Sequence, residues 1–192
     1  MKPSLSLVIP FYNEAGNILP LTEACVAVLT ATGRPFEAIL VNDGSTDGTP
    51  RALRERAAEV GPHVHVLELR RNFRQTAAMQ AGIDAARGDV IVTMDVDFSH
   101  DPAVIPAMLA AIESGADAVV GSRYVRGGGT VNWPIHRRLL SRWGNLYTGF
   151  LLGVRVRDCT SGFRAYRSSA LASIAPETTR ADGYAFLTEL VL

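Results

Sequence analysis

The stretch FEAILVNDGSTDGTPRALRERAAEV, residues 36–60, contains one unit of the pattern that decides the fold. Residues 36–42 are an apolar run that predicts a buried strand, and residues 48–60 predict a helix with Pro50 in its first turn. The Asn, Asp, Ser and Gly residues between them predict a tight loop at the carboxyl end of the strand. A strand, a loop and a helix in this order are typical of α/β proteins.

The same alternation runs through the first two thirds of the chain. Further strands are predicted at residues 4–10, 63–69, 89–95 and 116–122, and further helices at 17–31, at 75–86 and from Pro102 onward, with Asp101 as N-cap. This order predicts a mostly parallel sheet with helices on both faces. No internal repeat or linker divides the sequence, so residues 1–192 are expected to form a single domain.

The composition excludes several classes of protein. The 192 residues are 47% hydrophobic with a formal net charge of zero, which suits a globular domain and not a chain that binds nucleic acid or membranes by overall charge. Cys25 and Cys159 lie outside any CxxC motif and are interpreted as small buried side chains in a reducing compartment. No signal peptide is evident, and no apolar run approaches the ~18 residues that span a bilayer. The chain is therefore expected to be soluble or peripheral.

Charge is unevenly distributed along the sequence. Residues 1–122 contain 9 basic and 15 acidic side chains, a net charge of −6. Residues 123–167 contain 9 arginines and only one acid, Asp158, a net charge of +8. An acidic part followed by a basic part suggests that the two parts have different tasks.

Loops at the carboxyl ends of parallel strands bind ligands. The candidate loops are PFYNE (10–14), NDGSTDG (42–48), RNFRQ (71–75), DVDFSHDP (95–102) and SRYVRGGG (122–129). Asp43 could accept hydrogen bonds from a base or ribose, Tyr12 offers a stacking face and Glu14 an acceptor, although all three residue types are common in ordinary turns. The sequence has neither GxGxxG nor a P-loop, so it does not indicate a dinucleotide fold or a P-loop NTPase.

Asp95 and Asp97 are two carboxylates one residue apart at the end of a predicted strand. In an extended strand end they point the same way, and they repel each other unless a cation lies between them. Hard oxygen ligands suit Mg²⁺ or Mn²⁺, with the hydroxyl of Ser99 as a third ligand. A cation held in this way would also bind the phosphates of a substrate. The alternative is a pair of solvated acids before the next helix.

Residues 132–152 predict an amphipathic helix with a wide apolar side. Its other side includes Arg137, Arg138, Ser141 and Arg142. It suits an interfacial helix or an ordinary helix with a solvated basic side. Because acids are scarce nearby, the guanidinium groups suit a phosphate. The segment RDCTSGFRAYR, residues 157–167, adds Arg164 and Arg167, either as a second wall of this basic site or as an exposed turn and strand.

Seven motifs, in their order along the chain, resemble the inverting family-2 glycosyltransferases of GT-A fold, and among them the polyprenol (dolichol) phosphate mannose synthases. They are IPFYNE, VNDGSTDGT, MDVDFSHDP, GSRY, GGGTVNWPIHRRLLSRWGN, RDCTSGFRAYR and GYAFLTE. The resemblance covers nearly all 192 residues. The first three motifs are common to many such transferases, whereas the full patterns MDxDxSHDP and NWPxHRRxxSRxGN are much more specific to the polyprenol-phosphate branch.

The resemblance implies a role for each matching position. Residues 1–122 would bind the nucleotide sugar and residues 123–192 the acceptor. The nucleoside would be held by Pro10, Tyr12, Glu14, Val41 and Asp43, and the diphosphate and metal by Asp95, Val96 and Asp97, with Ser99 as third metal ligand. The catalytic residues would be Asp95, Asp97 and Arg123. The acceptor phosphate would be bound by Arg123, Arg137 and Ser141, and Glu189 would lie near the sugar.

The implied reaction is the transfer of mannose from GDP-mannose to polyprenyl (dolichyl) phosphate, with Mg²⁺ or Mn²⁺ and with inversion. It would take place at the cytoplasmic face of a membrane, which the protein contacts peripherally. Two alternatives stay open: another donor such as UDP-glucose or UDP-galactose with a lipid-phosphate or polysaccharide acceptor, and a truncated domain that only binds a partner. A nucleic-acid surface is disfavoured, because few stacking aromatic residues lie among the arginines.

Three features depart from the family pattern. Asn42 replaces the first acid of an Asp-Asp pair, and Ser99 stands where many relatives have Gln. The segment that follows the GYxFxxE helix in the family is absent. Because GYAFLTELVL, residues 183–192, also predicts a helix with no cap and no Gly or Pro stop, we expect the chain to be truncated at its C-terminus.

Overall fold

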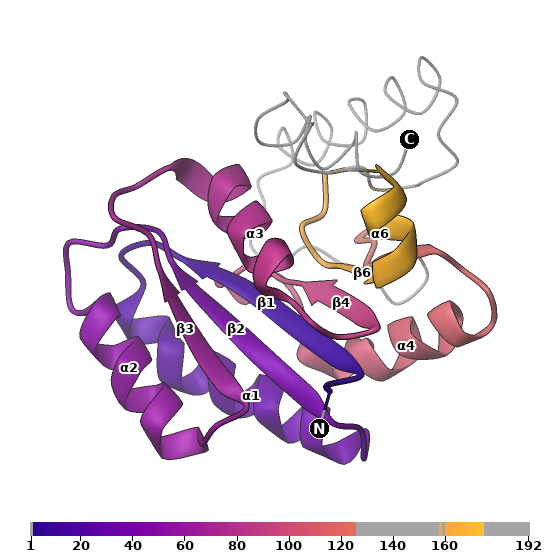
Figure 1. Cartoon of the computed structure of the whole chain (residues 1–192), viewed down its shortest axis with the longest axis horizontal. Helices are drawn as coiled ribbons and strands as arrows, with labels where there is room; N and C mark the ends of the chain where they lie inside the picture. The colour runs from indigo at the N-terminus through magenta and orange to yellow at the C-terminus, as the bar shows by residue number, and fades with distance from the viewer. Residues whose placement is uncertain (1, 126–157, 159, 175–192) are drawn as a thin grey trace.

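The computed structural model describes residues 2–125, 158 and 160–174, and these contain one six-stranded sheet in the order β3-β2-β1-β4-β6-β5 (Figure 1). The strands are β1 (Leu5–Phe11), β2 (Phe36–Asn42), β3 (Val64–Glu68), β4 (Val90–Thr93), β5 (Ala118–Val120) and β6 (Arg164–Arg167). β1 to β4 pair in parallel, whereas β6 is antiparallel to both β4 and β5. The predicted α/β fold with a mostly parallel sheet is confirmed.

Helices cover both faces of the sheet (Figure 1). α1 (Ile18–Ala31), α2 (Thr49–Val60) and α4 (Ile105–Glu113) lie on one face, and α3 (Arg74–Ala85) and α6 (Ser168–Ile174) lie on the other. The pleat of β1 explains this arrangement, since Leu7 and Ile9 belong to the first buried cluster and Val8, between them, belongs to the second. Two short 3-10 helices, η1 (Ala15–Asn17) and η2 (Pro102–Val104), precede α1 and α4.

The boundaries of most predicted elements are reproduced, and one difference matters for the site. β4 ends at Thr93, so Asp95 and Asp97 lie in the following loop and not in an extended strand end. The chain turns there, with Phe98 at a φ of 56°, which is incompatible with an extended strand. Asp101 is the N-cap as predicted, and its carboxylate accepts a hydrogen bond from the backbone N–H of Ala103 at 2.9 Å.

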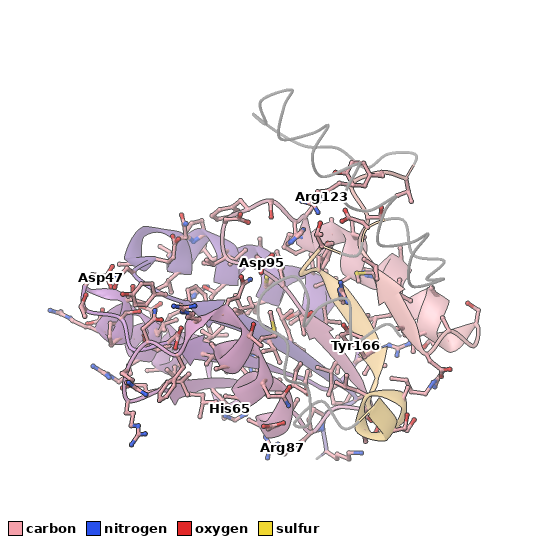
Figure 2. The ribbon with its side chains drawn as sticks, turned by 90° about the horizontal axis from the view of Figure 1, so that it is seen from above. Asp47, His65, Arg87, Asp95, Arg123 and Tyr166 are labelled. Atoms are coloured by element: carbon pink, nitrogen blue, oxygen red, sulfur yellow. The ribbon has the colours of Figure 1, made fainter. Side chains whose placement is uncertain are left out.

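At the amino ends of the strands, which we call the amino edge of the sheet, the buried carboxylate of Glu37 connects β1, β2 and the segment before β4. It accepts hydrogen bonds from the Ser6 hydroxyl at 2.7 Å and from the backbone and guanidinium of Arg87. Burial by itself raises the pKa of Glu37, but these hydrogen bonds and the charge of Arg87 outweigh it, so the pKa lies below its ordinary value. Figure 2 shows Arg87 toward one end of the sheet and Asp95 and Arg123 toward the other, where the ligand loops lie.

The remaining sequence predictions concern the two cysteines, the helices at 132–152 and 183–192, and membrane-spanning segments. Cys25 is buried, as predicted, and burial raises its pKa to about 12. Cys159 and the helices predicted at 132–152 and 183–192 lie outside the described residues. No helix within residues 2–125 and 160–174 is both long and apolar enough to cross a bilayer.

Candidate active site

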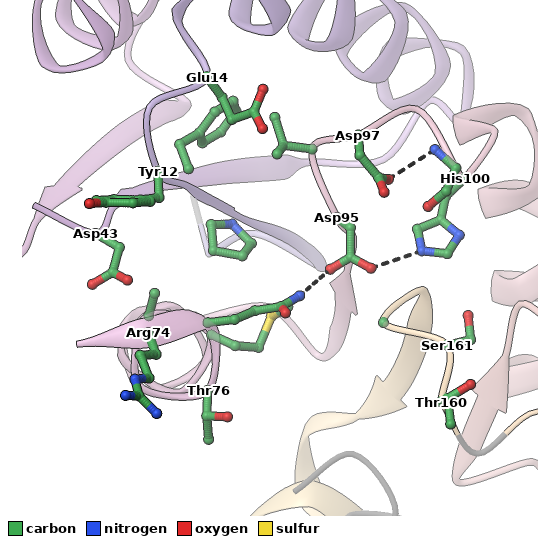
Figure 3. Close-up of a pocket in the computed structure, with 18 of the residues that line it drawn as sticks. Tyr12, Glu14, Asp43, Arg74, Thr76, Asp95, Asp97, His100, Thr160 and Ser161 are labelled. Atoms are coloured by element: carbon green, nitrogen blue, oxygen red, sulfur yellow. Dashed lines mark hydrogen bonds and ion pairs between the residues drawn. The ribbon is translucent and has the colours of Figure 1, made fainter. Parts of the chain in front are cut away.

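A cavity of about 630 Å³ opens at the carboxyl ends of β1, β2 and β4 (Figure 3). Its lining includes the predicted site residues Pro10, Tyr12, Glu14, Asp43, Asp95, Val96, Asp97, Ser99 and Arg123, although they come from four separate loops. Val41 does not line it, because its side chain is buried in the cluster beneath α3. Arg137, Ser141 and Glu189 lie outside the described residues.

Hydrogen bonds join the loop after β1 (residues 10–14) to the loop after β2 (residues 42–48). The backbone N–H of Asn13 donates to the Ser45 hydroxyl at 3.0 Å, and the N–H of Thr46 donates to the Asn13 side chain at 2.9 Å. The side-chain oxygen of Asn42 accepts from the N–H of Ser45, so the residue that departs from the family pattern caps its own turn. Tyr12, at the rim, is 46% exposed and offers its ring to the cavity mouth.

The loop between β3 and α3 forms a further wall of the cavity. The sequence predicted that this loop, RNFRQ (71–75), could bind a ligand, but it assigned no role to its residues. The backbone N–H of Phe73 donates to one carboxylate oxygen of Asp43 at 2.8 Å and orients this acid. Gly44, at a φ of 63°, lies under this loop, and a Cβ there would approach the Arg71 carbonyl carbon to 2.2 Å. Because no larger residue fits, Gly44 allows the two loops to pack together.

Asp95 is held from three sides (Figure 3). One oxygen accepts from the Gln75 side-chain amide at 2.6 Å, and the other lies 3.1 Å from a ring nitrogen of His100. On the third side, a Cβ at Gly162 would lie 2.5 Å from the carboxylate. His100 is buried and stacks on Phe163 with ring centroids 5.2 Å apart. These contacts fix the position of Asp95 before any ligand binds.

Asp97 has a different environment. One of its carboxylate oxygens accepts a hydrogen bond from the backbone N–H of Ser99 at 3.0 Å, which stabilises the turn after β4. Asp97, Asp95 and Ser99 line the same cavity. The two acids therefore line the same cavity, but they do so from a turn after β4 and not from the predicted strand end.

The lining fits a divalent cation that is shared with a ligand. Among residues 2–125, 158 and 160–174, no three His, Cys, Asp or Glu side chains converge as a metal site of their own. The cavity wall nevertheless has four acids, Glu14, Asp43, Asp95 and Asp97, against two arginines. Carboxylate and hydroxyl oxygens suit Mg²⁺ or Mn²⁺, and these ions commonly complete their coordination with substrate phosphates.

Arg123, which follows β5, also lines the cavity and is paired with the buried Asp158. Its Nε and one terminal nitrogen donate to the two carboxylate oxygens, both at 2.8 Å. Burial raises the pKa of Asp158, but the hydrogen bonds and charge of Arg123 outweigh this effect, so the pKa lies below its ordinary value. Asp158 therefore carries a negative charge at neutral pH.

The interpretation of Arg164 and Arg167 as a wall of the basic site is wrong. Both belong to β6, inside the sheet, and neither lines the cavity. Arg164 is fully buried and donates to the backbone carbonyl of Ser161 at 2.7 Å, so it is not in an exposed strand either. Arg167 donates to the carbonyl of Ile112 at 2.6 Å. Both guanidinium groups donate to backbone carbonyls and so serve the packing around β6.

Comparisons with known proteins agree with this geometry. Residues 6–174 match the family Glycosyl transferase family 2. The chain is 40% identical to the polyprenol monophosphomannose synthase of Mycolicibacterium smegmatis over 96% of its length and 69% of that protein's. It is also 40% identical to the undecaprenyl-phosphate mannosyltransferase of Micrococcus luteus, over 95% of the chain and 74% of that protein. A third relative, the dodecaprenyl-phosphate galacturonate synthase of Rhizobium johnstonii, is 40% identical over 88% of the chain, which spans 49% of that protein.

Solved structures share the fold at lower identity. A glucosyl-3-phosphoglycerate synthase from Mycobacterium tuberculosis in complex with UDP superposes with a TM-score of 0.70 at 20% identity, over 98% of this chain and 64% of that one. A mannosyltransferase from Pyrobaculum calidifontis in complex with GDP-Man and Mn²⁺ superposes with a TM-score of 0.58 at 21% identity, over 99% of this chain and 52% of that one. The chain thus has the GT-A fold and belongs to glycosyl transferase family 2.

Proposed function

We propose that this chain transfers mannose from GDP-mannose to a polyprenyl phosphate, with inversion and with a divalent metal. The observation that carries the proposal is that Tyr12, Asp43, Asp95, Asp97 and Arg123 line one cavity. Figure 3 shows Tyr12 and Asp43 to one side of Asp95 and Asp97. Two relatives at 40% identity, of which the chain covers more than two thirds, are named as polyprenol and undecaprenyl-phosphate mannosyltransferases.

The nucleoside would lie between Tyr12 and Asp43. The ring of Tyr12 is exposed at the rim and can stack on a base. Asp43 is only 2% exposed and is oriented by the N–H of Phe73, so its second oxygen can accept from an N–H of guanine. A buried, fixed acceptor distinguishes bases by their donors, because an unmatched base would leave the carboxylate unpaired.

The diphosphate would lie beside Asp95 and Asp97. These acids and Ser99 would hold Mg²⁺ or Mn²⁺, which when bound neutralises the negative charge that develops on the leaving nucleotide diphosphate. Gln75 and His100 orient Asp95 through the contacts described above. His100 is not a suitable general base, because its ring is buried and one of its nitrogens faces Asp95.

The reaction needs no strong base in the protein. The acceptor phosphate is ionised at neutral pH, so one of its oxygens can attack the anomeric carbon of mannose directly while the bond to the diphosphate breaks on the opposite side. The protein has to orient the two substrates in line, which is a large part of catalysis in such reactions. Arg123, Arg137 and Ser141 are the residues proposed to hold the acceptor phosphate. We also propose that the protein contacts the cytoplasmic face of a membrane peripherally, since a lipid acceptor would lie in a membrane.

A second candidate keeps the acceptor but changes the sugar. It is favoured by the galacturonate synthase of Rhizobium johnstonii, which is as similar in sequence as the two mannosyltransferases. The Asp95 and Asp97 end of the cavity is expected to be the same for either sugar, because both donors contain a diphosphate.

Donor choice and activity can be tested in one experiment. The purified chain is incubated with polyprenyl phosphate, Mg²⁺ and equal concentrations of GDP-mannose, UDP-glucose and UDP-galactose. The masses of the lipid products are then determined by mass spectrometry. We expect a hexosyl phospholipid, lost when GDP-mannose is omitted and when EDTA is added. A product that depends on a UDP-sugar would overturn the donor. A folded chain that gives no product with any donor, and that binds nucleotide too weakly to measure, would favour the non-catalytic alternative.

A further inference from the structure

Among the residues that the structure describes, Arg123 and Asp158 form the most completely buried ion pair, and Arg123 lines the cavity. Asp158 has no exposed side-chain surface and Arg123 retains 13%. The two residues are 35 positions apart in the sequence. Asp158 is also the one acid within the basic segment 123–167. Neither the proposed function nor the family motifs give this acid a role.

The contacts between the two residues define the orientation of the guanidinium plane. Nε and one terminal nitrogen of Arg123 donate to different oxygens of Asp158 at 2.8 Å, and the backbone N–H of Arg123 adds a third bond at 3.2 Å. The same terminal nitrogen donates to the Thr160 hydroxyl at 2.7 Å, and that hydroxyl lies 3.1 Å from Asp158. A two-pronged contact of this kind fixes both the position and the plane of the guanidinium.

The ion pair is not needed to join the two segments. The backbone N–H of Gly121 donates to the carbonyl of Phe163 at 2.8 Å, and the Ser161 hydroxyl donates to the carbonyl of Gly121 at 2.8 Å. β5 and β6 are also paired in the sheet. Because these bonds already hold the chain together, the specific effect of Asp158 is on the side chain of Arg123.

We propose that Asp158, supported by Thr160, is a positioning residue that presents Arg123 to a substrate phosphate in the cavity. The inference rests on the proposed function, since it assumes that phosphates bind on this wall. A free arginine loses side-chain freedom when it binds a phosphate, whereas a guanidinium already held by a buried carboxylate loses much less. The phosphate is that of the acceptor or of the donor, and the two sources are separated by the test.

Chemical rescue tests this role in a way that a merely structural contact does not. Arg123→Ala removes the guanidinium but leaves the carboxylate of Asp158, so added ethylguanidinium can occupy the vacated place. We expect Arg123→Ala to lower kcat/KM at least 100-fold. Millimolar ethylguanidinium should then raise the kcat/KM of this variant at least tenfold. In the double variant Arg123→Ala/Asp158→Asn we expect no restoration. Ethylammonium, which has no fork of donors, and Arg167→Ala, an arginine outside the cavity, serve as controls.

The two phosphate sources are distinguished by titrating each substrate. If Arg123 faces the acceptor, ethylguanidinium lowers the KM for polyprenyl phosphate and leaves the affinity for GDP with Mg²⁺ unchanged. If it faces the donor, the affinity for GDP with Mg²⁺ recovers. Rescue that is equal with and without Asp158, or Arg123→Ala with wild-type kcat/KM, would overturn the inference.

Failure of the proposed function is seen separately, because the wild-type chain would then transfer no sugar. In that case the readout is the binding of GDP with Mg²⁺ and of inorganic phosphate. Ethylguanidinium that restores binding only when Asp158 is present would support the inference. No such restoration for either ligand would contradict it. If Arg123→Ala does not fold, Arg123→Lys keeps the charge without the two-pronged contact. We expect Arg123→Lys to lower kcat/KM or phosphate affinity at least tenfold, and an unchanged value would overturn the inference.

Discussion

Adding one methyl group at Gly162 should displace the carboxylate of Asp95. A Cβ at this position would lie 2.5 Å from one carboxylate oxygen and 2.7 Å from the other, whereas ordinary contacts begin at 3.4 Å, so the acid must move by about 0.9 Å. The hydrogen bond from Gln75, now 2.6 Å, would then exceed the hydrogen-bond limit of about 3.2 Å if Gln75 stayed in place. Gly162 does not have a positive φ, so the substitution acts through this contact and not through backbone strain.

The expected cost to catalysis follows from the size of this displacement. A misplacement of about 1 Å in a catalytic group lowers the rate by roughly 100-fold. That factor corresponds to about 2.7 kcal/mol of transition-state stabilisation, at 1.36 kcal/mol for each tenfold change. For Gly162→Ala we therefore expect kcat/KM for GDP-mannose to fall about 100-fold, together with a higher Mg²⁺ concentration for half-maximal activity.

Gly16→Ala is the matched control, because a Cβ at Gly16 meets no atom within 4 Å. Both variants and the wild-type chain are assayed at a fixed polyprenyl phosphate concentration over a Mg²⁺ titration, with thermal unfolding measured alongside. Gly162→Ala with kcat/KM within twofold of wild type and an unchanged Mg²⁺ requirement would refute the role given to the fixed Asp95.

Three further predictions concern the site, a turn and the amino edge of the sheet. Asp97→Ala should abolish transfer while leaving the fold intact, and transfer by this variant at the wild-type rate would contradict the metal assignment. Gly44→Ala should lower the free energy of unfolding by about 3 kcal/mol, through backbone strain and the clash with Arg71, as measured by urea titration. Because the pKa of Glu37 is lowered in the folded state, its contribution to stability is present above its unfolded pKa and is lost as the pH falls through the folded value. Urea titrations of wild type and Glu37→Gln between pH 7 and pH 3 should therefore converge at the acid end, and a constant difference would contradict the assignment.

The parallel part of the fold could be predicted from the sequence because its signals are local. The strand at Phe36–Asn42 was predicted to the residue, since an apolar run ends there in a turn of Asn, Asp and Gly. The place of β6 between β4 and β5 could not be predicted. This strand follows β5 by more than forty residues, and antiparallel pairing over such a distance leaves no periodic pattern in the sequence.

The site was predictable to a similar extent. The acids at positions 95 and 97 are separated by a single residue, so their spacing indicates a shared role. The groups that hold Asp95 come from three places in the chain. Gln75 lies in the first turn of α3, His100 lies in the same loop as Asp95, and Gly162 lies just before β6, and no spacing rule joins them. Asp158 did leave a signal, because a lone acid among nine arginines is a natural partner for one of them.

The proposed inverting transfer of mannose to a polyprenyl phosphate is tested most directly by the stereochemistry of the product. The purified chain is incubated with GDP-mannose, polyprenyl phosphate and Mg²⁺, and the lipid product is isolated and its anomeric configuration determined by NMR. We expect a β-mannosyl phosphoryl lipid that does not form when EDTA is present. An α-linked product, or mannose released as the free sugar with none attached to the lipid, would contradict it.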